Sequence, residues 1–433
     1  MCQYKGTCIR HHRPDLDFET KFCAPEPQIR ASITELYILV PQSIENIICH
    51  TNYEKSFNIL WKVSSKKDFI IDELFLSKEF VTSSADAINN GFGSIPDYTI
   101  YVLSFFCNLI YQTNSTMEFE NIEVFILSVL RIIQLNEIEI SFICFRFLAN
   151  LFYNYPKYAQ LCYENNLFEA LYAYVENYLD ENNNMGDFFT LISSLWQSVD
   201  SKLYIMFNRF IPLCATCCAN QNITVRLRST DCISLLISSD IGFHFFNESS
   251  ERDILIFAHE LLFTGQLKSL YSALYCFVQH NIFDIFDNES FYLGVREILQ
   301  KGIEPFGKKL FELLYSLVEH YHHFFYTSHL DSILYDYSLN SNFKSRTGSL
   351  YVLSKLYEHS TEVQYDCIQT LIHSIPSMEC TQQKPILKSL YNTILKFPLA
   401  QSLDFDELII YLNETDPSIS DSFISILQNN RCL

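Results

Sequence analysis

An apolar phrase with helical spacing returns at intervals of 37 to 46 residues along this chain of 433 residues. A short unit of this kind cannot bury its apolar face alone, so neighbouring copies must stack to close a shared core. The copies are FNILWKV (57–63), SFFCNLI (104–110), RFLANLF (146–152), LISSLWQ (191–197), SLLISSD (234–240), SALYCFV (272–278), ELLYSLV (312–318), VLSKLYE (352–358) and SLYNTIL (389–395). In register, they place at one helical position Lys62, Asn108, Asn150, Ser194, Ile237, Cys276, Ser316, Lys355 and Asn392.

A period of this length is typical of armadillo and HEAT repeats. Apolar spacing predicts helices over 138–153, 157–165 and 167–178, with Pro156 separating the first two. Three helices in one period favour the armadillo unit over the two-helix HEAT unit. We therefore predict an all-α fold, a right-handed armadillo-repeat superhelical solenoid of about nine three-helix units. Because a solenoid of this kind has a long concave surface, we expect the chain to bind another protein.

The chain divides at its N-terminal end. Residues 1–30 are polar, contain three prolines and lack the period, which predicts a flexible arm. The solenoid is expected to span 31–433, with capping helices near 404–413 and 418–428. The predicted connectors are DENNNMGD (180–187), SSDIG (238–242), NSNFKS (340–345) and IPSMECTQQKP (375–385).

Charge restricts the partners. The chain has 30 Lys and Arg against 50 Asp and Glu, a formal net charge of −20. This field repels nucleic acid and anionic lipid and favours basic proteins. The alternative is that acidity only keeps an apolar solenoid in solution. With 27 Tyr and 37 Phe, the core is expected to be unusually aromatic.

The 15 cysteines lie along apolar helix faces, which predicts buried free thiols in a reducing compartment. The N-terminal sequence lacks the apolar region of a signal peptide. The uncharged stretch 98–117 is too short and too polar to cross a bilayer, so no membrane insertion is expected.

Motifs for catalysis and cofactor binding are absent. The sequence contains no GxGxxG, GxxxxGK[ST], HExxH or GxSxG. We therefore expect no enzymatic activity, no cofactor and no metal.

Three groups of Cys and His residues have alternative explanations. For the first group, in the N-terminal arm, the two interpretations are a zinc site and a disordered arm. Its spacing fits a tetrahedral zinc site poorly. The second, CATCC, is expected to be core rather than a redox pair. The third, HYHH, cannot share one helix face, which favours a solvated or partly buried helix end. The groups are Cys2, Cys8, His11, His12 and Cys23; Cys214, Cys217 and Cys218; and His320, His322 and His323.

Two asparagines, Asn108 and Asn150, stand at the same phase of adjacent units inside apolar helices. A buried amide is costly unless it is hydrogen-bonded. Both side chains could lie on the concave face and bind the backbone of an extended peptide. Each could instead pair with a neighbouring helix or loop.

Four segments together resemble importin-α, the armadillo adaptor for nuclear import cargo. No single motif is specific, and the order and spacing carry the resemblance, which covers about residues 55–240. The segments are FNILWKVSS (57–65) with IIDELFLSKEFV (70–81); VLSFFCNLIYQTN (102–114); FRFLANLFYNYPKYAQLCYENNLFEAL (145–171); and LISSLW (191–196) with FNRFIPLCATCC (207–218).

The resemblance implies a peptide-binding groove made by Trp and Asn residues four apart on successive helices. The Asn positions are occupied here by Asn108, Asn150 and Ser194, and the Trp positions by Ser104, Arg146 and Thr190. Arg146 would repel a basic peptide. Trp61 and Trp196 are out of phase with these positions and are assigned to packing.

The resemblance also implies partners and a location. Extended segments of cargo proteins, including basic signals, are the expected ligands, with the protein in cytoplasm and nucleus. In the family a basic N-terminal segment binds importin-β. The basic residues of 1–30 are scattered, so an importin-β-like carrier stays open. The alternative function is a scaffold for complex assembly without transport activity.

Overall fold

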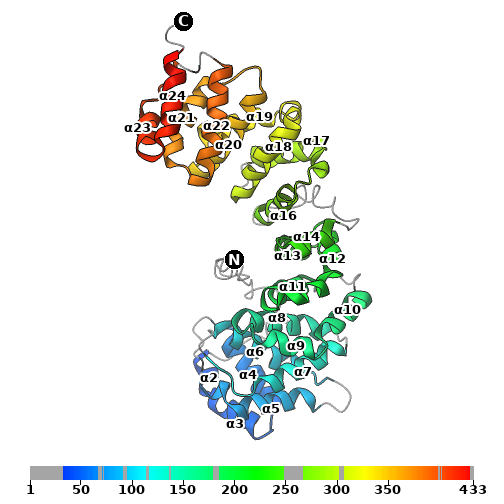
Figure 1. The fold of residues 1–433 in the computed structure, drawn as a ribbon. Coiled ribbons are helices and arrows are strands. Elements are labelled where there is room, and N and C mark those ends of the chain that lie inside the picture. Colours follow the sequence, from blue (N-terminus) through cyan, green and yellow to red (C-terminus); the bar gives the residue numbers. More distant parts are fainter. Residues whose placement is uncertain are drawn as a thin grey trace. The chain divides into compact units, whose positions relative to one another are not determined.

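The computed structural model describes residues 33–66, 71, 73–90, 95–113, 117–135, 138–178, 185–247, 267–301, 307–397, 400 and 402–429. Every regular element in these ranges is a helix, which confirms the all-α prediction (Figure 1). The predicted arm lies outside the described residues, as do Cys2, Cys8, His11, His12 and Cys23.

The chain forms two compact units. Unit 1 comprises Met1–Ile211 and Asn220–Cys232, and unit 2 comprises Pro212–Ala219 and Ile233–Leu433.

Unit 1 has two layers of helices. In one layer the helices that carry the repeated phrase pack each on the next (Figure 1). They are α4 (Tyr53–Ser64), α6 (Thr99–Gln112), α8 (Ile138–Asn154) and α11 (Met185–Ser198). The second layer contains α3 (Val40–Ile48), α5 (Lys78–Asn89), α7 (Ile122–Gln134), α9 (Tyr158–Glu164) and α10 (Leu167–Tyr178). We call the first layer the long-helix layer.

Unit 2 repeats this packing. Its long-helix layer contains α16 (Leu267–Gln279), α18 (Gly307–Thr327), α20 (Phe343–His359) and α22 (Cys380–Lys396). Its second layer contains α17 (Glu289–Gln300), α19 (Leu330–Asn340), α21 (Tyr365–Ser374) and α23 (Asp406–Thr415), with α24 (Pro417–Asn429) on α23. The two last helices confirm the predicted C-terminal pair.

The described residues also form several further helices. They are α2 (Ile33–Ile38), α12 (Phe210–Cys217), α13 (Ile223–Leu236), α14 (Asp240–Asn247) and the 3-10 helices η1 (Glu73–Leu76), η3 (Ser201–Phe207), η4 (Asp284–Phe286) and η5 (Ile375–Ser377).

Polar residues define where several helices begin. Ser77 caps α5, because its side chain accepts a hydrogen bond from the backbone N–H of Phe80. Asn342 caps α20 in the same way, accepting from the backbone N–H of Ser345. Such caps satisfy amide groups that have no partner within the first helical turn.

Aromatic side chains fill the core, as the composition predicts. Phe106 of α6 and Phe125 of α7 stack with ring centroids 4.0 Å apart, which joins the two layers of unit 1. Both side chains are fully buried. Burying one large apolar side chain contributes about 1.5–3 kcal/mol, so rings of this kind dominate the packing energy.

In unit 2, α18 is divided into two helical segments by a kink at Tyr321. Two helices, the short segment after Tyr321 and α19, therefore lie between the first segment of α18 and α20, and α21 and the 3-10 helix η5 lie between α20 and α22. The connector predicted over 375–385 is wrong in part, because α22 begins at Cys380 and contains Pro385. Pro385 lies in the second turn of α22, where proline removes one backbone hydrogen bond of the helix.

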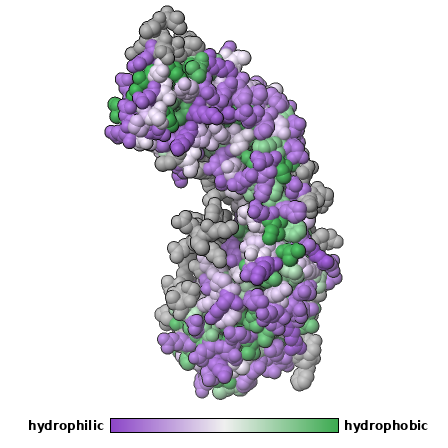
Figure 2. Space-filling view, viewed as in Figure 1, coloured by the Kyte–Doolittle hydropathy of each residue, from purple (hydrophilic) through white to green (hydrophobic). Residues whose placement is uncertain are grey.

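On the face drawn in Figure 2, hydrophilic residues predominate and apolar residues form separate small patches. The exposed large apolar residues are spread over many elements and include Leu74, Ile205 and Ile410. Among the described helices, none combines the length and apolar character needed to cross a membrane.

Candidate functional site on the long-helix layer of unit 1

Asn108 joins α6 to α4. Its side-chain Nδ2 donates to Ser64 Oγ at 3.1 Å, and one turn later Gln112 Nε2 donates to the Ser64 carbonyl at 2.8 Å. The Asn108 side chain is half-buried, so part of it faces solvent beside this contact. Asn108 therefore has a structural partner and an accessible side.

Asn150 makes the equivalent contact one helix later. Its Nδ2 lies 3.3 Å from the Cys107 carbonyl oxygen and 3.4 Å from Cys107 Sγ. Asn154 Nδ2 donates to the Ile110 carbonyl at 2.6 Å. In α11, Ser198 Oγ donates to the Phe152 carbonyl of α8 at 3.2 Å. Successive long helices are thus connected by hydrogen bonds from repeated positions, and both amides use the neighbouring helix.

Arg146 is buried and paired, contrary to the expectation that it would oppose a basic peptide. Its Nε and Nη2 donate to Asp187 Oδ1 at 3.0 and 2.8 Å, and Nη2 also donates to Oδ2 at 3.0 Å. The two residues are only 6% and 8% exposed. The carboxylate neutralises the guanidinium, so Arg146 presents no free positive charge.

Burial raises the pKa of Asp187 above its ordinary value, while the Arg146 charge and hydrogen bonds act in the opposite direction. The prediction that Asp187 lies in the DENNNMGD connector is wrong. In the structure α11 already begins at Met185, so Asp187 occupies its first turn, and residues 180–184 lie outside the described part.

The other predicted positions differ in accessibility. Ser104, Thr190 and Ser194 are half-buried. Thr190 Oγ1 donates to the Gly186 carbonyl at 3.0 Å within its own helix. In α8, by contrast, every residue from Ile143 to Phe152 is buried. The structure therefore leaves Ser104 and Asn108 of α6 accessible, while Arg146 and Asn150 are not.

An aromatic pair lies beside these residues, and the repeat pattern does not reveal it. Trp61 of α4 and Tyr101 of α6 stack with centroids 5.5 Å apart and an interplanar angle of 21°. Both are half-buried. From its position outside the repeated groove positions, Trp61 is expected to be a packing residue. Tyr101, one turn before Ser104, is the signal in the sequence that could have located the pair. We call Trp61, Tyr101, Ser104 and Asn108 the α4/α6 surface.

The cysteine group in α12 belongs to the core, as predicted. Cys214, Cys217 and Cys218 are buried and form no disulfide. Burial raises the pKa of the Cys217 thiol to about 11, so it is protonated at neutral pH and unsuited to redox chemistry. No group of His, Cys, Asp or Glu in the described ranges has the arrangement of a metal site.

The histidine run lies at a kink in α18 where two helical segments meet, in keeping with the predicted solvated or partly buried helix end. Tyr321 has non-helical dihedral angles, φ −134° and ψ 28°. His320 and His323 are exposed, whereas His322 is half-buried and stacks on His359 of α20, with centroids 4.6 Å apart. Glu319 lies near the same pair, its Oε2 3.8 Å from His359 Nε2.

Unit 2 is expected to lose stability in mild acid because of His359. Burial, followed by the nearby charge of His322, lowers the pKa of His359 below its ordinary value. The unfolded chain then binds a proton more readily, so stability falls as pH drops from about 6.5 through the lower folded-state pKa. Denaturation at about pH 7.5 and about pH 5.5 should show a smaller loss in His359→Gln than in the parent. His323→Gln, on the exposed side of α18, is the control and should keep the full loss. An equal loss in all three proteins would contradict this assignment.

Comparisons with known proteins identify the fold but no family. No protein-family model matches the chain, and no curated protein gives a significant match. One similar solved structure is an engineered protein from the Northeast Structural Genomics Consortium, with a TM-score of 0.65. It is 8% identical, and the match covers 89% of this chain and 99% of that one. At this identity the likeness concerns the fold alone: the chain shares an all-α fold with that protein.

Proposed function

We propose that this chain is a non-enzymatic adaptor that holds an extended segment of a partner protein on the long-helix layer of unit 1. The observation that carries this proposal is the α4/α6 surface, where a stacked aromatic pair and a half-buried amide lie on the same two adjacent helices. We further propose a right-handed armadillo-repeat solenoid for the whole chain, in keeping with the repeated phrase and the layered packing of each unit.

The chemistry of the α4/α6 surface suits a basic peptide. A flat aromatic pair accepts the methylene stem of a Lys or Arg side chain, and its ring faces attract the cation. Asn108 supplies an amide group for the peptide backbone beside that pair. The net charge of −20 would draw basic segments toward the protein. Nuclear import of such cargo, with residence in cytoplasm and nucleus, is the process that the resemblance to importin-α suggests.

Tyr101→Ala is expected to weaken binding of a basic signal peptide by about fivefold, because one cation–π contact contributes about 0.5–2 kcal/mol. Fluorescence anisotropy with the labelled peptide and the full chain measures this. Phe343→Ala is the control, since Phe343 is an accessible aromatic residue that lies in unit 2. If the peptide does not bind, or if both variants weaken it equally, the α4/α6 surface is not the site.

Asn108→Ala tests the backbone contact in the same assay. It removes the amide but leaves the aromatic pair, so we expect a loss of about 0.5–1.5 kcal/mol in binding free energy. Asn150→Ala serves as its counterpart, because Asn150 is buried and contacts Cys107. It should reduce stability while leaving the affinity of the folded protein unchanged. If Asn150→Ala weakened peptide binding and Asn108→Ala did not, the peptide would lie on α8.

A scaffold without transport activity is the second candidate. The observation that favours it is the buried Arg146–Asp187 pair, which fills a position where the resemblance implies an aromatic side chain for peptide binding. Affinity purification from cell extract separates the two functions. Proteins with basic segments that are bound through the α4/α6 surface, and lost in Tyr101→Ala, favour the adaptor. Partners that are retained in that variant and exclude import receptors favour the scaffold.

A further inference from the structure

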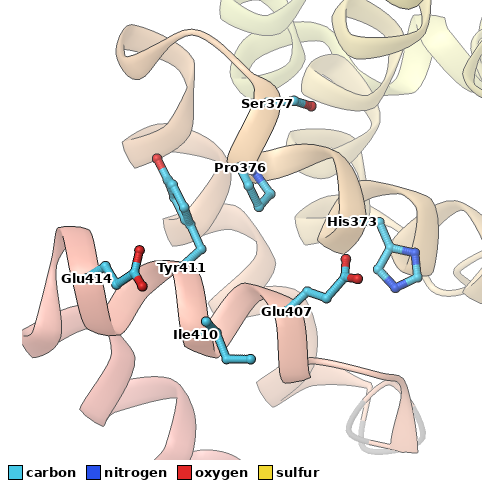
Figure 3. Close-up of a pocket in the computed structure, with 7 residues that line it drawn as sticks. All are labelled: His373, Pro376, Ser377, Glu407, Ile410, Tyr411 and Glu414. Atoms are coloured by element: carbon cyan, nitrogen blue, oxygen red, sulfur yellow. The ribbon is translucent and has the colours of Figure 1, made fainter.

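Unit 2 carries a pocket of about 450 Å³ between the α21–η5 segment and α23 (Figure 3). One wall is formed by His373, Pro376 and Ser377, and the other by residues of α23. This volume lies within the range of small-ligand pockets, and the pocket is open to solvent. The pocket is in the second layer of unit 2 and shares no residue with the α4/α6 surface.

The ring of Tyr411 is fixed in place by hydrogen bonds behind it. Gln383 Nε2 donates to the carbonyls of Ile375 and Met378 at 3.2 and 3.0 Å. The Gln383 Oε1 atom therefore accepts, and Tyr411 Oη donates to it at 3.1 Å. Because the hydroxyl is used in this way, Tyr411 offers the pocket an aromatic ring rather than a free hydroxyl.

The histidine on the opposite wall is hydrogen-bonded through its ring to a neighbouring glutamine. Gln369 Oε1 accepts from the backbone N–H of Asp404 at 2.9 Å, which fixes the orientation of the Gln369 amide. Its Nε2 must then donate, both to the Asp404 carbonyl and to His373 Nε2, each at 3.0 Å. These contacts fix the position of the His373 ring at the edge of the pocket.

Along the α23 wall of the pocket, two apolar side chains stand between two acidic ones. Glu407 and Glu414 are exposed and stand two helical turns apart, with Ile410 and Tyr411 between them (Figure 3). Ile410 is 61% exposed, an unusual position for a large apolar residue on a polar helix. Residues 397–430 include six Asp or Glu residues and no Lys, Arg or His. No basic residue of this segment neutralises the two carboxylates.

We propose that this pocket binds a lysine or arginine side chain from a basic segment of a partner protein. The methylene stem lies over Ile410 and Tyr411, and the cation pairs with Glu407 or Glu414. Only these two side chains combine a long apolar stem with a positive charge at its end. The ring of Tyr411 adds a cation–π contact. The site thus gives unit 2 its own contact to basic proteins.

The test uses the full chain and a short fluorescein-labelled peptide of alternating lysine and glycine. Glu407→Gln with Glu414→Gln removes two charges and keeps the side-chain size. Asp421→Asn with Glu362→Gln removes two exposed charges elsewhere in unit 2 and is the matched control. We expect the pocket variant to bind about fivefold more weakly than the control variant, as expected for the loss of one or two partly exposed ion pairs.

Two further peptides separate the pocket from the general acidic field. Acetylated lysine keeps the stem without the charge, and diaminopropionic acid keeps the charge without the stem. Both should bind more weakly than the lysine peptide to the parent chain. Hydrogen exchange should show that the lysine peptide protects 365–378 and 406–415. This protection should persist in Tyr101→Ala, which makes the result independent of the α4/α6 surface.

Three outcomes would overturn the proposal. One is equal weakening by the pocket and control variants, which would indicate the field of the whole protein. Another is equal affinity of the lysine and diaminopropionic acid peptides, since the apolar wall would then have no role. The last is the absence of peptide-dependent protection at α21 and α23.

Discussion

Asp187→Ala is expected to destabilise unit 1 by about 3–5 kcal/mol, the largest effect of any single substitution considered for this chain. The substitution leaves the Arg146 guanidinium buried without its carboxylate, at a site where both residues are less than one-tenth exposed. Both tryptophans, Trp61 and Trp196, belong to unit 1. Tryptophan fluorescence during urea denaturation therefore reports the unfolding of this unit directly.

Two controls separate a buried pair from an ordinary ion pair. Glu176 faces Arg209 at 3.5 Å in the same unit, with both side chains well exposed. Glu176→Ala should therefore change stability by less than about 1 kcal/mol. Arg146→Met combined with Asp187→Leu removes both charges, and the double variant should be more stable than Asp187→Ala alone. A loss below about 1 kcal/mol in Asp187→Ala would show that the pair does not support the layer.

Gly348→Ala is expected to destabilise unit 2 by about 2–3 kcal/mol, although alanine is the better helix former. A Cβ atom at position 348 of α20 would lie 2.3, 2.5 and 2.7 Å from three ring atoms of Phe311 in α18. Phe311 is 4% exposed and cannot move aside without disturbing its neighbours. The close approach of α18 and α20 therefore requires glycine here.

Hydrogen exchange locates the effect of Gly348→Ala, because α18 and α20 should exchange faster while unit 1 is unchanged. Gly186→Ala is the comparison. Its Cβ would lie 3.1 Å from Thr224 Cγ2 and farther from other atoms, so we expect a change within about 1 kcal/mol. Adding Phe311→Leu to Gly348→Ala should restore part of the lost stability by freeing space. If it does not, the contact with Phe311 is not the cause.

The sequence by itself determined the helical layers and much of the core. The periodic phrase alone identifies α4, α6, α8, α11, α16, α18, α20 and α22, and apolar spacing places the final two helices within about two residues of their ends. The burial of Cys214, Cys217 and Cys218 also follows from their apolar surroundings. These features depend on residues three or four positions apart, and such local spacing can be read directly from a sequence.

Only the tertiary structure decided which side chains meet. Arg146 pairs with Asp187, which lies on the next long helix and not in the connector that the sequence pattern predicts. Trp61 stacks on Tyr101 across two helices, and this contact makes an apparent packing residue part of the candidate site. Contacts of this kind depend on which helix lies alongside and on its rotation. Those are set by the packing of whole layers, so a period along one chain does not determine them.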